Sequence, residues 1–157
     1  MSKISASQFW QFSLHTYANE QVQHTLLHWQ NEHRLNVNLC LLLAYLDCHQ
    51  LAISPVQLET LTDVINEFDQ HALQPLRSVR AFLKSEQQHI THYADMRKQM
   101  LALELEFEKH QQAELIAACN ALSMTTHAHP NNLTHYLPKA LLPLKNDLDQ
   151  ALHSVSY

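Results

Sequence analysis

Residues 37–46 read Val-Asn-Leu-Cys-Leu-Leu-Leu-Ala-Tyr-Leu, an almost unbroken apolar run in the first third of the chain. A helix that is apolar around its whole circumference is typically surrounded by other helices. We therefore predict a central buried helix over about residues 37–49. Its apolar stretch, residues 39–46, is far shorter than the roughly 20 residues needed to cross a bilayer, so it does not predict a membrane span.

Helical periodicity extends outward from this run in both directions, and no segment alternates strictly between apolar and polar residues. We predict an all-α, single-domain bundle of five or six helices over residues 1–157. The segments are about 7–18, 20–33, 37–49, 54–72, 75–84, a long helix over about 86–122, and a last helix ending near 153. The pattern leaves open whether 75–84 and 86–122 are continuous. Pro143 either kinks the last helix or marks its beginning.

The composition excludes several classes of protein. The 157 residues contain no glycine, which disfavours tight β-hairpins, phosphate-binding loops and dinucleotide-binding turns. The net charge of −5 argues against a nucleic-acid partner. No pattern typical of a signal peptide is present, so we expect a cytoplasmic protein whose cysteines, Cys40, Cys48 and Cys119, are reduced and mostly buried.

Three helical spacings are compatible with metal or substrate binding but are interpreted as exposed surface. They are His24 with His28, Glu86 with His89, and Glu59 with Asp63 and Glu67. Thirteen histidines make chance pairs at helical spacing common. A di-iron carboxylate site needs a second Glu-x-x-His that this chain lacks, and the acidic stripe lies opposite the apolar face of its helix. We therefore predict no cofactor, metal site or catalytic residue.

A charged set on two helices is more informative. Arg77, Arg80 and Lys84 share one face of the fifth segment, beside the apolar positions that border the core. Glu104 and Glu108 fall within the apolar arc of the long helix. A buried carboxylate needs a partner, because leaving it unpaired costs several kcal/mol. We predict that the bases and acids meet, either as a structural network between helices or as a polar pocket in which the arginines also bind an anionic group.

Four sequence blocks together resemble a bacterial family of conserved hypothetical proteins catalogued as a domain of unknown function. They are residues 9–17 (Phe-Trp-Gln-Phe-Ser-Leu-His-Thr-Tyr), 37–43 (Val-Asn-Leu-Cys-Leu-Leu-Leu), 76–84 (Leu-Arg-Ser-Val-Arg-Ala-Phe-Leu-Lys) and 102–106 (Ala-Leu-Glu-Leu-Glu). The resemblance covers about Phe9 to Ala118, so residues from about 120 to 157 look like a C-terminal extension.

The resemblance implies a soluble intracellular bacterial protein and no particular reaction, ligand or cofactor. Family members often carry glycine and aspartate before the Val-Asn pair, whereas Leu35 and Asn36 stand there in this chain. We therefore expect a different cap at the beginning of the third helix.

Two functional hypotheses remain. The first is a non-catalytic interaction or adaptor module that binds a protein partner or a second copy of itself. Its contact surface would lie on the aromatic first helix, at Phe9, Trp10, Phe12, Leu14 and Tyr17. The second is a bundle that binds a small molecule or metal, perhaps catalytically, in a polar pocket near Arg77, Arg80, Glu104 and Glu108. Membrane-surface binding is disfavoured because the amphipathic helices lack lysine-rich polar faces.

Overall fold

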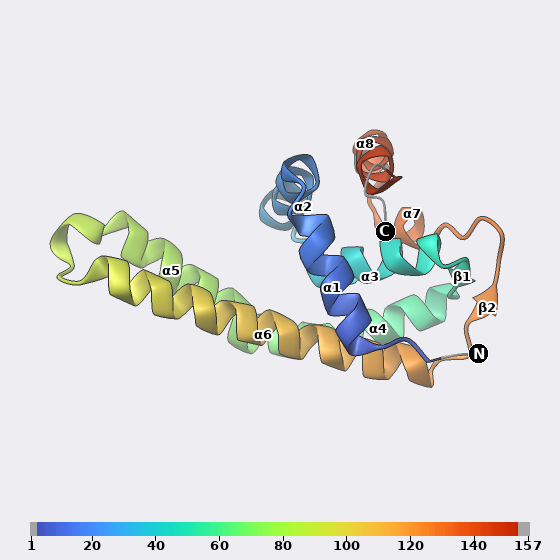
Figure 1. The fold of residues 1–157 in the computed structure, drawn as a ribbon, viewed down its shortest axis with the longest axis horizontal. Helices are drawn as coiled ribbons and strands as arrows, with labels where there is room; N and C mark the ends of the chain where they lie inside the picture. The colour runs from blue at the N-terminus through green and yellow to red at the C-terminus, as the bar shows by residue number, and fades with distance from the viewer. Residues whose placement is uncertain (1–2, 154–157) are drawn as a thin grey trace.

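The computed structural model describes residues 3–153 and confirms an all-α fold (Figure 1). The helices are α1 (Ala6–Tyr17), α2 (Glu20–His33), α3 (Val37–Cys48), α4 (Pro55–Phe68), α5 (Gln74–Ser85), α6 (Tyr93–Ala121), α7 (Asn132–Tyr136) and α8 (Leu142–His153). Shorter π and 3-10 segments are η1 (Asp69–Leu73), η2 (Gln87–His89) and η3 (Lys139–Leu141). No helix within residues 3–153 combines the length and the apolarity needed to span a membrane.

Helix α3 is the centre of the core, as its sequence predicts. Every residue from Asn38 to Leu46 is buried, and α1, α2, α6 and α7 all pack against the helix. The Asn36 side chain caps its beginning by accepting a hydrogen bond from the Leu39 amide at 2.9 Å. Asn36 is therefore the cap of α3 in this chain.

The chain remains helical from Pro55 to Ser85, but with a change of winding that the sequence does not predict. Helix α4 begins at a capping box formed by Ser54 and Gln57 and ends at Phe68, not near residue 72 as expected. The π segment η1 then leads into α5. Pro75 explains the position of this change, because it has no N–H to donate and its ring crowds the carbonyl one turn earlier.

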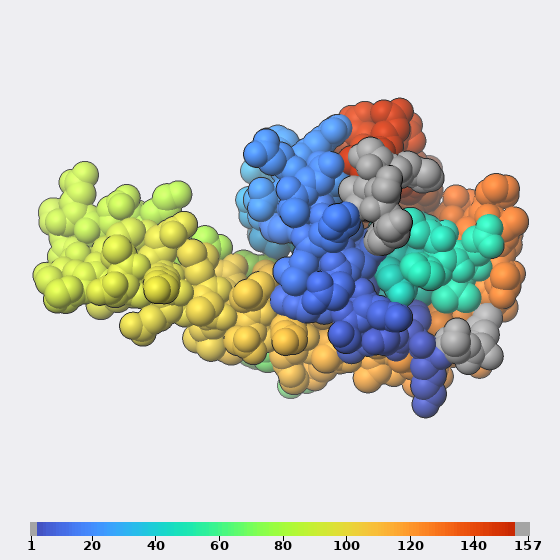
Figure 2. Space-filling model, in the orientation of Figure 1, coloured from blue at the N-terminus to red at the C-terminus, as the bar shows by residue number. Residues whose placement is uncertain are grey.

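Helices α5 and α6 form an antiparallel hairpin that projects from the rest of the molecule, and we call it the arm (Figures 1 and 2). The two segments are not continuous, and the long helix begins at Tyr93, so the expected beginning near residue 86 is wrong. Ile90 is extended and His92 adopts a left-handed conformation with φ of 62°, which ends the helical path between them. A left-handed histidine is uncommon, and without glycine in the chain no sequence signal marks it.

The C-terminal elements cover α3 and α2, with Leu133, Leu137, Leu141 and Leu148 in the core. Helix α8 begins beside Pro143, which settles the alternative between a kink and a beginning. The short helix α7 and a two-residue antiparallel pairing between β1 (Leu51–Ala52) and β2 (Thr125–Thr126) were not expected from the sequence.

Candidate functional site

The predicted charge pairing is present at the root of the arm. Arg80 holds Glu104 through two hydrogen bonds, from Nε to Oε2 at 2.7 Å and from Nη2 to Oε1 at 3.2 Å. Arg77 donates from Nε to Glu104 Oε1 at 3.4 Å and from Nη2 to Glu108 Oε1 at 3.1 Å. Its Nη1 lies 3.9 Å from Asp69 of η1. Two arginines of α5 thus bind two glutamates of α6, and we call these four residues the ion-pair network.

A chain of buried amides continues the ion-pair network into the core. Asn36 donates from Nδ2 to Asp69 at 3.3 Å and to Gln111 at 3.1 Å. Asn38 Nδ2 donates to Gln111 Oε1 at 2.9 Å, and Gln112 Nε2 donates to Asn38 Oδ1 at 3.0 Å. These hydrogen bonds fix the rotation of α6 relative to α3, because a small rotation would break them, although the buried Gln112 Oε1 has no hydrogen-bond partner within residues 3–153.

Burial raises the pKa of Glu108, a member of the network, and of Tyr17, which lies near it. Desolvation raises the pKa of Glu108 above its ordinary value, and the Arg77 guanidinium opposes this shift only in part. Burial, followed by the nearby Glu108 charge, raises the pKa of Tyr17 to about 12. Glu104 is 9% exposed, and its carboxylate is the one held by both arginines.

Lys84 does not join the network. It is exposed and makes no ion pair with any residue between 3 and 153. In an antiparallel hairpin that places Arg80 opposite Glu104, a residue one turn farther along α5 lies opposite Met100 and Leu101, where α6 offers no acid. The predicted pairing of Lys84 with the acids of α6 is therefore wrong.

The ion-pair network opens onto a cleft of about 540 Å³ between α1, α2 and the arm. The cleft brings the two predicted sets of residues together, because Trp10, Leu14 and Tyr17 of the first helix line it along with the network. Its other lining residues include Leu27, Val37, Leu41, Arg97, Leu101, Leu105 and Gln112. Arg97 is a site residue that the sequence reasoning missed. Its position two turns before Glu104, on the same side of α6, was the available signal.

Phe9 and Phe12 lie in the core, which corrects their expected place on a contact surface. They are 0% and 4% exposed, and both rings pack against Tyr45 of α3, at centroid distances of 5.6 Å and 5.1 Å. Leu14 is 44% exposed, and Trp10 and Tyr17 are partly buried at the cleft. Most of the wide apolar arc of α1 is thus buried or partly buried against other elements of the protein.

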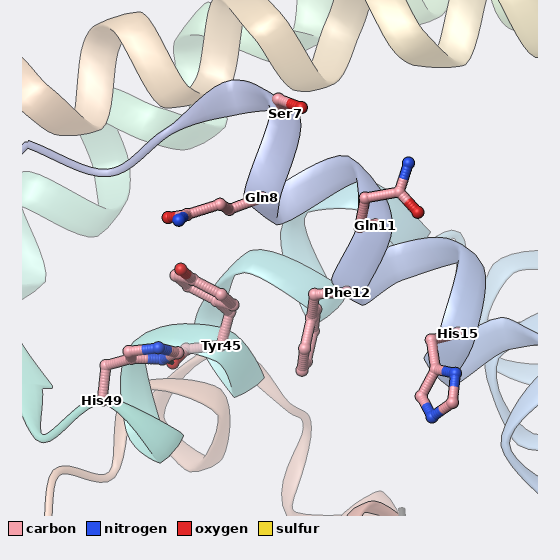
Figure 3. A pocket seen from close by; sticks show the side chains of 7 residues that line it. All are labelled: Ser7, Gln8, Gln11, Phe12, His15, Tyr45 and His49. Atoms are coloured by element: carbon pink, nitrogen blue, oxygen red, sulfur yellow. Dashed lines mark hydrogen bonds between the residues drawn. The ribbon is translucent and has the colours of Figure 1, made fainter. Parts of the chain in front are cut away.

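A second pocket, of about 840 Å³, lies between α1 and the end of α3 (Figure 3). Phe12 and Tyr45 stand side by side there, and the His49 ring stacks on Tyr45 with centroids 4.0 Å apart. Its lining, also including Ser7, Gln8, Gln11 and His15, contains no Asp, Glu, Lys or Arg. The pocket is apolar and aromatic, and it is separate from the charged residues predicted as a site.

The other residues at metal-ligand spacing are exposed, except Glu86, which is partly buried. His24, His28, Glu59, Asp63 and Glu67 are all exposed, and His89 lies near the tip of the arm. Within residues 3–153 no group of three or more His, Cys, Asp or Glu side chains is arranged to hold a metal ion.

Replacing Glu104 with leucine should lower the free energy of unfolding by about 2 kcal/mol. The substitution removes the carboxylate that the partly buried guanidiniums of Arg77 and Arg80 share. The expected loss of stability is smaller than for a fully buried ion pair, because Arg80 is partly exposed. Urea denaturation measures the effect. Glu106→Leu, at an exposed position on the same helix, is the control and should change stability by less than about 0.5 kcal/mol. Equal effects of the two variants would contradict a stabilising role for the network.

Replacing Glu108 with glutamine should reveal its raised pKa as a pH dependence. Because its pKa is raised, the Glu108 carboxyl group holds its proton more tightly in the folded state than in the unfolded state. Ionisation of Glu108 therefore destabilises the fold as the pH rises. The glutamine variant cannot ionise. Its free energy of unfolding minus that of the unmodified protein should therefore increase between about pH 4 and about pH 7. A difference that stays constant or decreases over this range would show that Glu108 is not desolvated.

The comparisons with known proteins identify a family without an assigned activity. A family model described as "Protein of unknown function (DUF2390)" matches residues 8–115, which contain most of α1, all of α2 to α5, most of α6, the ion-pair network and the cleft. No curated protein and no solved structure matches the chain. The match agrees with the resemblance that the sequence blocks indicated over about residues 9–118. The chain belongs to the family of proteins of unknown function DUF2390.

Proposed function

We propose that this protein is a non-catalytic interaction module of the cytoplasm, and that it presents one apolar side of the arm to a partner protein. The observation that carries this proposal is the exposure of large apolar side chains on the arm. Val79 and Phe82 of α5 are 50% and 63% exposed, and Met96 and Leu103 of α6 are 43% and 46% exposed. No side chain of α5 is buried.

These four side chains belong to one surface of the hairpin, which we call the arm face. On α5 an apolar stripe follows helical spacing, and a matching stripe runs along α6. The stripes are Leu76, Val79, Phe82 and Leu83 on α5, and Met96, Met100, Leu103 and Phe107 on α6. Because the helices are antiparallel and Arg77 meets Glu108 on the cleft side, both stripes fall on the side of the hairpin away from the cleft. The edge-to-face contact of Phe68 with Phe107 extends the arm face to the root of the arm.

The size of the arm face supports an interaction role. With about 200 Å² of surface for a large apolar side chain, the four exposed residues leave about 400 Å² of apolar area in contact with water. An exposed apolar area of that size falls within the range of about 300–600 Å² that is usual for the largest patch on a monomer, and such patches are often functional. Two apolar stripes on the hairpin favour a partner that supplies an amphipathic helix, from another protein or from a second copy of this chain.

The ion-pair network serves this role by holding the arm at its root. A hairpin without buried side chains of its own along α5 gains little stability from apolar burial. The charge pairing of Arg77 and Arg80 with Glu104 supplies a specific, directional contact instead. We assign the network a structural role in this proposal, with the arm face as the contacting surface.

The double substitution Val79→Ser and Phe82→Ser should abolish partner binding while the fold is retained, because it removes exposed apolar area and leaves the core unchanged. Sedimentation measures self-association, and quantitative mass spectrometry after affinity capture from the native host measures binding of other proteins. At least one of these associations should fall by about tenfold or more.

Val56→Ser is the matched control for this experiment. Val56 is 71% exposed on α4, outside the arm, so its replacement should leave both associations unchanged. If the double variant and the control behave alike in sedimentation and in capture, the arm face is not the contact surface and the proposal is wrong.

A further inference from the structure

We infer that the cleft between α1, α2 and the root of the arm binds a small organic molecule that has an apolar body and a single negative charge. The inference does not depend on the proposed function of the arm face, since the two surfaces lie on opposite sides of the hairpin. It is carried by the size of the cleft, the chemistry of its walls and the balance of charge among its lining residues.

The cleft has the dimensions of a ligand site. Its volume of about 540 Å³ falls within the range of about 300–1,000 Å³ that is usual for pockets that take small molecules. Residues of α1, α2 and α3 line one side and residues of the α5–α6 hairpin line the other, so the two sides come from distant parts of the sequence. The hydrogen bonds of Arg77 and Arg80 to α6 fix the wall that the hairpin provides.

Two walls of the cleft are apolar and remain accessible. Leu14 of α1 and Leu27 of α2 are 44% and 37% exposed, and Leu105 of α6 is 47% exposed. All three line the cleft, as does the Trp10 ring. An apolar ligand body in contact with these side chains would remove from water the apolar surface that the fold leaves exposed there.

The charges of the lining are nearly balanced, with one cation in excess. The ionisable lining residues comprise three arginines, Arg77, Arg80 and Arg97, and two glutamates, Glu104 and Glu108, together with the neutral phenol of Tyr17. The difference of three and two leaves +1 among the lining residues of a chain whose formal charge is −5, and Asp69, which lies 3.9 Å from Arg77, does not line the cleft. A ligand with one negative charge would neutralise this excess.

Arg97 is the group that carries the excess charge. Both glutamates are already held by Arg77 and Arg80, whereas the exposed side chain of Arg97 makes no hydrogen bond or ion pair within residues 3–153. A planar guanidinium without a partner is suited to bind a carboxylate through two parallel hydrogen bonds. The nearby Glu104 and Glu108 would repel a ligand with two or more negative charges, which is why the inference specifies a monoanion.

The test uses 4-phenylbutyrate as the probe, with 4-phenylbutanol and 4-phenylbutylamine as ligands that have the same apolar body but no negative charge. Calorimetric titration of the full-length protein should show saturable binding of 4-phenylbutyrate, with a dissociation constant of about 1 mM or tighter. The alcohol and the amine should bind at least about tenfold more weakly. Trp10 fluorescence should change during the titration because this ring lines the cleft.

Two pairs of variants locate the bound probe. Arg97→Gln should weaken binding about tenfold, whereas Lys98→Gln, which removes the same charge from the neighbouring exposed position, should have little effect. Leu105→Ser should weaken binding, whereas Leu103→Ser should not, although the two leucines are almost equally exposed. Leu103 belongs to the arm face, so its replacement reports on the proposed function independently.

Three results would overturn the inference. They are the absence of saturable binding at about ten times the expected dissociation constant, equal affinity for the acid and the alcohol, and equal effects of Arg97→Gln and Lys98→Gln. Each of these results leaves the arm-face proposal untouched, because that proposal is tested by the Val79 and Phe82 substitutions.

Discussion

The position of the arm depends on a carboxylate shared between two guanidiniums. Glu104 lies at the boundary between the core and the projecting hairpin, where it is held by Arg77 and Arg80 of the opposite helix. Taking such charges out of water is costly, and the cost is offset only when hydrogen-bond geometry is good and every charge has a partner. The two short contacts from Arg80 and the link from Arg77 to Glu108 meet that requirement. Beyond this point the arm has few buried contacts, so its direction is fixed mainly at its root.

The hairpin also separates two surfaces of different character. One side forms a wall of the cleft, where apolar side chains of α1 and α2 face a partly charged lining. The other side is the arm face, which is apolar and borders no other helix of the described chain except at the root, near Phe68. Because both surfaces are built on the same two helices, a change in the angle of the arm would alter the cleft and move the arm face together. This coupling is a geometric consequence of the fold.

Much of the fold could be predicted from local sequence patterns. The apolar run at residues 37–46 identified the central helix, and the helical spacing of Arg77, Arg80, Glu104 and Glu108 predicted their pairing, because both features depend on short-range periodicity. The break between α5 and α6 could not be predicted, since it depends on a histidine in a left-handed conformation. The burial of Phe9 and Phe12 was missed for another reason. Periodicity shows that an arc of a helix is apolar but not which part of that arc other elements cover, and the cleft arises only when helices distant in sequence meet.

The most direct test of the account is the distance between the tip of the arm and the body of the protein. Cys48 is exposed while Cys40 and Cys119 are buried, so a spin label can be attached selectively to Cys48 and to a cysteine introduced by Ser85→Cys. Pulsed electron paramagnetic resonance should then give a single narrow distance distribution. The distribution should broaden clearly when Arg77 and Arg80 are both replaced by methionine. An equally narrow distribution in that variant would contradict the claim that the ion-pair network holds the arm in place.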